Sequence, residues 1–190
     1  MTRDDLFTHI HKALRKGLFD LTVLAGSTDW TDPAEVSALE DRWRPFVAFL
    51  RSHSRHEDDH ILRILDRDEP SATAVAAEQH EDLDALLDDL DGRFEAGVSA
   101  PDPAMGLALY RDLARFVAAY LPHLHEEETT IMERIWARCS DEEIAATRAA
   151  FMAELTADEM AMSMELMLPA LDRTTREMLL ARVAAGPVAS

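Results

Sequence analysis

The sequence predicts an all-α protein, an up-down-up-down four-helix bundle with one or two additional C-terminal helices. Two observations lead to this prediction. Apolar residues recur at alternating spacings of three and four along four long segments, and no segment alternates with the period of two that marks a strand. Short stretches rich in Gly, Pro, Ser, Thr and Asp separate these segments, so each helix can pack antiparallel to the next.

The first two predicted helices cover 3–25 and 33–66. Each carries its apolar residues along one face, and the break at Gly26 is followed by a polar stretch that cannot continue a helix. The second helix is expected to begin at Pro33, because proline is favoured in the first turn of a helix and Asp32 can cap it.

Two further helices are predicted over 72–95 and 103–139, again with one apolar face each. Together the four helices form a predicted bundle domain, 1–139.

The remaining chain, 140–190, is expected to be a helical extension that packs on the bundle. Capping boxes at Ser140 and Thr174 predict helices over 141–168 and 174–185. Five methionines crowd the first of these helices and either fill an irregular core or form a homodimer surface: Met152, Met160, Met162, Met164 and Met167.

The composition limits the partners. The chain has 37 acidic against 19 basic residues and a formal net charge of -18. Such a charge repels phosphate backbones and anionic membrane surfaces, which argues against nucleic acid and membrane as partners. No apolar stretch is long enough to span a bilayer, and the single Cys139 fits a reducing compartment. We therefore expect a cytoplasmic protein, and the excess of Arg over Lys, with abundant Ala, suggests a GC-rich bacterial genome.

The apolar stripe of each bundle helix runs through a histidine, and two stripes carry a glutamate one turn later. Residues i and i+4 lie nearly over one another on a helix, so each His-x-x-x-Glu pair presents an imidazole and a carboxylate to the core. Buried carboxylates are costly unless positive charge neutralises them. Imidazoles and carboxylates without thiolates suit iron or zinc, and six such ligands suit two bridged ions. The six residues are His11, His53, Glu57, His80, His123 and Glu127.

Four further residues near the stripes have more than one interpretation. His60 lies on the second stripe and is interpreted as a ligand, a proton shuttle or a core histidine. His56 and His125 flank the stripes, which favours contacts with the ligands or with solvent over direct ligation. Tyr120 is either a packed core residue or a hydrogen-bond donor to the centre. The acidic run 126–128 is expected to contribute one inward carboxylate with two solvated neighbours.

The two His-x-x-x-Glu pairs, with one histidine on each of the other two helices, resemble the HHE pattern of hemerythrin-like proteins over about residues 5–136. Ferritin-like bundles use Glu-x-x-His pairs instead, and the stripes carry none. The resemblance implies a non-haem di-iron centre with a bridging solvent oxygen, in which zinc or another divalent metal can replace iron. By this resemblance His11 and His53 bind one iron, His80 and His123 bind the other, and Glu57 and Glu127 bridge the two.

One position departs from the family pattern. Oxygen-carrying members have a further histidine one turn before the third-helix ligand, where this sequence has Ala76. One iron then has a protein ligand fewer, unless His56, His60 or His125 fills the vacancy. Such an iron should reduce peroxide more readily and hold O2 less securely, which argues against reversible oxygen carriage.

Two classes of function follow from the resemblance. In the first, the centre binds O2, peroxide or nitric oxide and, as an enzyme, disproportionates peroxide in a catalase-like reaction, with no catalytic residue beyond the metal ligands. In the second, the same centre stores oxygen, or senses oxygen or iron, without turnover and signals through the C-terminal helices.

Overall fold

The computed structural model describes residues 3–66 and 70–185, and over this part of the chain it contains helices and no strand. The all-α prediction is therefore confirmed. In chain order the elements are α1 (Thr8–Ser27), α2 (Pro33–His56), the π-helical turn η1 (Glu57–Ile61), α3 (Arg63–Asp66), α4 (Pro70–Ser99), α5 (Pro103–Glu126), the π-helical turn η2 (Glu127–Ile131), α6 (Met132–Arg138), α7 (Asp141–Glu154), α8 (Ala157–Ala170) and α9 (Arg173–Ala185).

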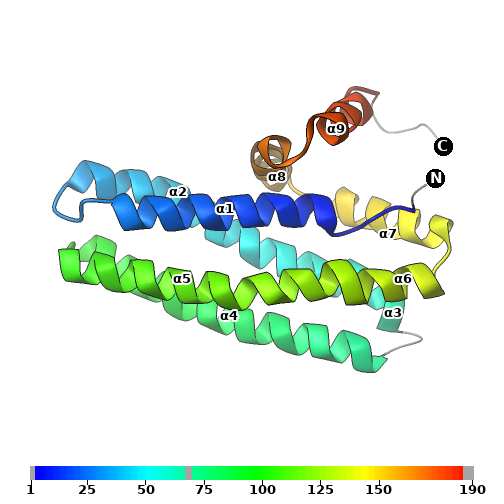
Figure 1. Cartoon of the computed structure of the whole chain (residues 1–190), viewed down its shortest axis with the longest axis horizontal. Coiled ribbons are helices and arrows are strands. Elements are labelled where there is room, and N and C mark those ends of the chain that lie inside the picture. Colours follow the sequence, from blue (N-terminus) through cyan, green and yellow to red (C-terminus); the bar gives the residue numbers. More distant parts are fainter. Residues whose placement is uncertain (1–2, 67–69, 186–190) are drawn as a thin grey trace.

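Four long helices, α1, α2, α4 and α5, extend side by side along the longest axis of the molecule, with α8 and α9 over one side (Figure 1). Their contacts close a ring, because α1 and α4 each pack against both α2 and α5. The apolar faces meet inside this ring, where burial of each large side chain contributes roughly 2 kcal/mol. The fully buried residues there include Leu14, Leu18, Leu39, Trp43, Phe94, Leu109 and Leu113.

Side-chain caps set where the first bundle helices begin. The Asp32 carboxylate accepts a hydrogen bond from Ala34 N at 2.8 Å, and Pro33 occupies the first turn of α2, as predicted. Helix α1 starts at Thr8 rather than at the predicted residue 3, and the Asp5 carboxylate accepts hydrogen bonds from Phe7 N and Thr8 N, both at 2.9 Å, just before its first turn.

The apolar core is divided into two clusters with a polar layer between them. On α1, Leu14 belongs to the larger cluster and Phe7, just before the helix, to the smaller one, with His11 between them. The same order recurs on α4, where His80 lies between residues of the two clusters. The polar layer is therefore enclosed by apolar side chains, which keep out water and strengthen electrostatic interactions within it.

Helix α2 continues into η1, and α5 continues into η2. Each of these turns contains one residue more than a turn of α-helix. Leu62 N donates to the carbonyl oxygen of Glu57 at 2.8 Å, and Met132 N donates to that of Glu127, so both bonds span five residues instead of four. The prediction of uninterrupted α-helices over 33–66 and 103–139 is therefore wrong, because a π turn interrupts each of them. Turns of this kind are rare and often occur at functional sites.

The first part of the C-terminal extension forms two helices, where one was predicted. The single helix expected over 141–168 ends at Glu154, and a new helix begins at Ala157. The reason is a second capping box, in which Thr156 Oγ1 accepts from Glu159 N at 3.2 Å and the Glu159 carboxylate accepts from Thr156 N at 2.8 Å. These bonds satisfy backbone donors that only a helix N-terminus leaves free, so they stabilise a break in the chain at this point.

The last helix, α9, also begins one residue earlier than predicted. The Asp172 carboxylate accepts from Thr175 N at 3.1 Å and so takes the capping role expected of Thr174. Helix α8 packs on α1 and α2, whereas α7 packs on η1. Over the described ranges, none of the helices combines the length and the apolarity needed to span a bilayer.

The carboxylate of Glu159 connects α8 to α2. It accepts a hydrogen bond from the Ser52 hydroxyl, and this contact holds the pKa of Glu159 at about 2, below its ordinary value of 4.5. The stabilisation is therefore present above pH 4.5 and is lost as the pH falls towards 2. The difference in urea midpoint between wild type and Glu159→Gln should shrink as the pH falls from about 5 to about 2. A difference that stays constant over this range would contradict the prediction.

Candidate metal centre

Four imidazoles and two carboxylates meet between the two apolar clusters. Each bundle helix supplies one histidine, and each π turn supplies one glutamate as its first residue. All six side chains are buried, and the most exposed residue of the set retains 5% of its accessible surface. Their donor atoms form two groups, each within 4.8 Å: His11, His53 and Glu57 in the first, and Glu57, His80, His123 and Glu127 in the second.

Glu57 belongs to both groups because its two oxygens face different histidines. Oε1 lies 3.2 Å from His53 Nε2 and 3.4 Å from His11 Nε2. Oε2 lies 3.5 Å from His80 Nε2. Glu127 also faces both groups, since its Oε1 lies 3.3 Å from His80 Nε2 and its Oε2 lies 3.6 Å from His11 Nε2. Both carboxylates thus lie between the two sets of imidazoles, where a bridging ligand would lie.

The outer ring nitrogens of three histidines face neighbouring acceptors. An acceptor at Nδ1 places the ring proton on that nitrogen and leaves the Nε2 lone pair directed into the centre. Two of these contacts are hydrogen bonds, His80 with Asp58 at 2.8 Å and His123 with the Gln79 amide oxygen at 3.0 Å, whereas His11 Nδ1 lies at ion-pair distance from Glu128, 3.3 Å.

Asp58 and Glu128 each directly follow a glutamate of the centre. In an α-helix consecutive side chains point about 100° apart, and the larger number of residues in a π turn reduces this divergence. The expectation that the neighbours of the fourth-helix glutamate are solvated is therefore wrong. Glu128 contacts His11, and Glu126 accepts from Gln79 Nε2 at 2.9 Å. The adjacency of acids in both motifs is the signal that could have shown this.

Nearby carboxylates hold protons on two of the imidazoles. Burial opposes positive charge on His11, but its contacts, above all with Glu128, outweigh burial and raise its pKa to about 9. Burial also opposes charge on His80, where the contact with Asp58 is the strongest of those that raise its pKa to about 12. With no cation bound, these two imidazolium groups neutralise the buried carboxylates only in part, because Glu128 and Asp58 share their charge.

The other two imidazoles and the two carboxylates of the centre also have shifted pKa values. Burial lowers the pKa of His53 to about 3 and that of His123 to about 4, so both imidazoles are neutral at pH 7. Burial and the charge of Glu57 raise the pKa of Glu127 to about 7. The surrounding imidazoles overcome burial at Glu57 and hold its pKa well below 4.5. The two carboxylates therefore compete for too little positive charge.

Several buried atoms of the centre have no hydrogen-bond partner among the described residues. They are His11 Nδ1, His53 Nε2, Glu57 Oε2 and both carboxylate oxygens of Glu127. Each such atom costs about 1–3 kcal/mol in a buried site. Imidazole and carboxylate lone pairs that face one another without protons between them suit a divalent transition metal. The residues present therefore fit a pair of bound cations.

The four additional candidates lie in different surroundings. Tyr120 is buried, and its ring stands edge-on to that of His123, with the centroids 5.7 Å apart. His56 and His60 turn towards α7 instead of the centre. His125 is exposed. Within the described part of the chain, none of these three histidines belongs to a donor group of the centre.

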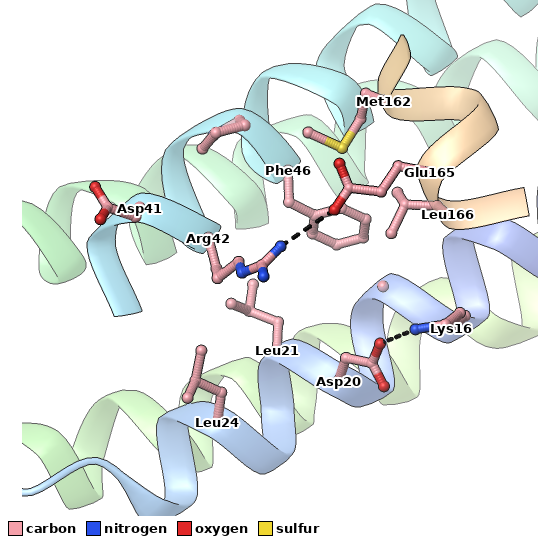
Figure 2. A pocket seen from close by; sticks show the side chains of 12 residues that line it. Lys16, Asp20, Leu21, Leu24, Asp41, Arg42, Phe46, Met162, Glu165 and Leu166 are labelled. Atoms are coloured by element: carbon pink, nitrogen blue, oxygen red, sulfur yellow. Dashed lines mark hydrogen bonds and ion pairs between the residues drawn. The ribbon is translucent and has the colours of Figure 1, made fainter. Parts of the chain in front are cut away.

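Two pockets are relevant to access. A pocket of about 290 Å³ opens between α4 and α5 and is lined by Gln79 and His123, so small molecules can approach the centre from this side. A larger cavity of about 530 Å³ lies between α1, α2 and α8 (Figure 2), and none of the six residues of the centre lines it. The larger cavity is therefore a feature of the extension and not of the centre.

Removing the acceptor at His80 should weaken metal binding. We expect Asp58→Ala to lower the affinity for a divalent metal by about tenfold or more, because the ring loses the partner that orients it. Asp59→Ala is the matched control, since Asp59 pairs with Arg63 on the surface. Competition with a chromophoric chelator measures both affinities, and an equal loss in the two variants would show that Asp58 has no special role.

Comparison with protein families agrees with this geometry. The family model described as the Hemerythrin HHE cation binding domain matches residues 2–135, which include all six residues of the centre and exclude the extension. Comparisons with curated proteins and with solved structures gave no match. Because the model covers well over half of the sequence, the chain belongs to the hemerythrin HHE cation-binding family.

Proposed function

We propose that the chain is a hemerythrin-like non-haem di-iron protein, with an up-down-up-down bundle, that binds O2 or related small oxidants such as peroxide and nitric oxide. The position of Glu57 supports this best, because its two oxygens face separate sets of imidazoles. A carboxylate in this position suits two cations better than one. The low cysteine content and the composition further support a cytoplasmic, bacterial protein.

The residues divide into two ligand sets around the shared carboxylates. Bound iron would supply Lewis acidity and redox chemistry towards a small oxidant. The donor set is also compatible with zinc or another divalent ion. His11 and His53 would hold one ion, His80 and His123 the other, and Glu57 and Glu127 would lie between them.

The surrounding residues contribute exclusion of water and a proton donor. Apolar clusters enclose the polar layer on both sides. Burial and the nearby carboxylates raise the pKa of Tyr120 well above 10, so its hydroxyl keeps its proton and can donate a hydrogen bond. Beyond the six proposed ligands and Tyr120, the described residues place no dedicated acid or base in the centre, which supports a small oxidant over an organic substrate.

Ala76 supports oxidant turnover over reversible oxygen carriage. It lies one turn before His80, is 3% exposed and belongs to the smaller apolar cluster. A methyl group offers no donor, so two imidazoles serve this side of the centre where oxygen carriers of the family have three. The freed position favours exchange of small ligands, and catalase-like disproportionation of peroxide is the reaction we would test first.

A second candidate function is an oxygen- or iron-sensing module, or an oxygen store, without turnover. The contact of α7 with η1 favours sensing, because it connects the extension to the turn that carries Glu57. The methionines of α8 are half-buried, and Met152 of α7 is 42% exposed, which is compatible with a homodimer surface in the extension. Small oxidants remain the proposed ligands in both cases.

The first test is the metal content of the purified chain. We expect two irons per chain with absorption bands of an oxo- or hydroxo-bridged pair. Removing them with a chelator should lower the melting temperature by roughly 10 °C, if the metal is present at about a thousand times its dissociation constant. One zinc per chain, or a melting temperature that chelation does not change, would contradict a di-iron centre.

The second test separates turnover from binding. The iron-loaded protein should consume peroxide and evolve oxygen, and His53→Ala and His123→Ala should each lose most of this activity, because each removes a ligand from a different ion. His125→Ala is the control, since His125 is exposed and outside both donor groups. A stable oxygen adduct without oxygen evolution would instead support the sensing or storage function.

A further inference from the structure

The C-terminal extension lies outside the family match and packs on one of the two π turns. The match ends at residue 135, whereas α7 begins at Asp141. The main contact of α7 is with η1, which begins with Glu57. The main contacts of η2, which begins with Glu127, are with α5 and α6, the helices that continue it along the chain. The two turns therefore differ in what surrounds them.

Glu154 and Phe151 of α7 contact the chain around η1, and Ile144 of α7 shares an apolar cluster with Ile61 of η1. Glu154 Oε2 lies 3.0 Å from His60 Nε2. Phe151 packs edge-to-face on His56, with ring centroids 5.4 Å apart, and on His60, with centroids 6.5 Å apart. His56 directly precedes Glu57, and His60 follows it within the same turn. Helix α7 thus contacts the chain on both sides of the carboxylate.

The N-terminal end of α8 adds a contact beside the centre. The Glu159 carboxylate accepts hydrogen bonds from the Ser52 hydroxyl and, at 3.4 Å, from Arg55. Ser52 directly precedes His53. The extension therefore contacts the stretch 52–60, which carries two of the six residues of the centre.

Helix α8 also packs along the bundle, where its main contact is with α1. The cavity of about 530 Å³ lies between it and the bundle, with Met162 and Leu166 lining it on one side and Phe46 on the other (Figure 2). At the rim, Arg42 pairs with Glu165 at 3.2 Å, but these side chains are 69% and 62% exposed. Exposed pairs of this kind contribute little to stability. The extension is therefore held by the packing of α8 on α1, to which this pair adds little, and by the contacts beside the centre.

The π-helical form of η1 makes these contacts important for Glu57. A π turn is rarer than the α-helix that could replace it and needs support from its surroundings. If η1 changed from a π turn to a regular α-helix, the chain before it would rotate relative to the chain after it by about 100°, the angle per residue of an α-helix. Glu57 would then point in another direction relative to His60. A contact that fixes His60 therefore also fixes the direction of the carboxylate.

We propose that α7 is a positioning element of the metal centre: Phe151 and Glu154 hold η1 in the form that directs Glu57 between the two sets of imidazoles. This inference rests on the proposed metal-binding function. Since coupling between two sites is reciprocal, metal binding also tightens the docking of the extension.

The test compares metal binding by full-length variants. Phe151→Ala should weaken binding of Co²⁺ by up to about tenfold and change the visible spectrum of the bound ion, and Glu154→Leu should do so to a smaller extent because its side chain is 61% exposed. Glu154→Gln keeps a polar group beside His60 Nε2 and should lose less affinity than Glu154→Leu. Glu165→Ala is the matched control, because it removes a contact of α8 that lies away from η1.

The reciprocal effect is measured by limited proteolysis of the junction between α7 and α8. Addition of Co²⁺ should protect this junction in wild type and in Glu165→Ala, and should protect it much less in Phe151→Ala. Glu154, whose side chain is 61% exposed, tests the same contact with little risk to folding.

Variants that bind Co²⁺ with the wild-type affinity and spectrum, while their extension is cleaved faster, would overturn the inference. Equal loss of affinity in Glu165→Ala would also overturn it, because the effect would then be one of general stability. A wild-type chain that binds no divalent metal would contradict the proposed function itself, so the two failures are distinguishable.

Discussion

The structure depends on neutralising two carboxylates that lie inside an apolar bundle. Glu57 and Glu127 are at most 1% exposed and are enclosed by two apolar clusters. Uncompensated, each would cost several kcal/mol. The imidazoles of His11 and His80 supply positive charge in the absence of a cation, but Glu128 and Asp58 share this charge, and burial together with the charge of Glu57 raises the pKa of Glu127. The helices must bring four imidazoles to one level to meet this requirement, and the family relationship reflects it.

The two π turns allow two consecutive acidic side chains to point towards the centre. Each turn supplies a carboxylate to the centre and then, from the next residue, a carboxylate to the outer nitrogen of a histidine on another helix. Asp58 follows α2 and orients His80 of α4, whereas Glu128 follows α5 and orients His11 of α1. The pair α1 and α2 thus supplies an acceptor to the pair α4 and α5, and the pair α4 and α5 supplies one in return. The orientation of each pair's first histidine depends on the other pair, which favours cooperative assembly of the centre.

The sequence predicts the helices and the six residues of the centre better than the details around them. Apolar spacing follows from the helical period, and a histidine on each stripe can be read directly. Asp58 and Glu128 were not predicted to contact the centre, because a regular α-helix would turn them away from it. The break after Glu154 was missed because the apolar pattern continues across it, while a local capping box at Thr156 ends the helix. Both differences arise where a local hydrogen-bonding preference overrides the regular period.

The extension makes the two halves of the centre unequal. The apolar clusters, the buried carboxylates and the π turns recur in both halves, but α7 covers η1 and leaves η2 to its own flanking helices. His56 and His60 have the sequence positions of additional ligands, yet their rings pack on Phe151. Their role is thus better explained by the extension than by the metal. A histidine close to a metal motif can serve to attach a neighbouring helix, and here it attaches that helix at the one turn whose shape decides where Glu57 points.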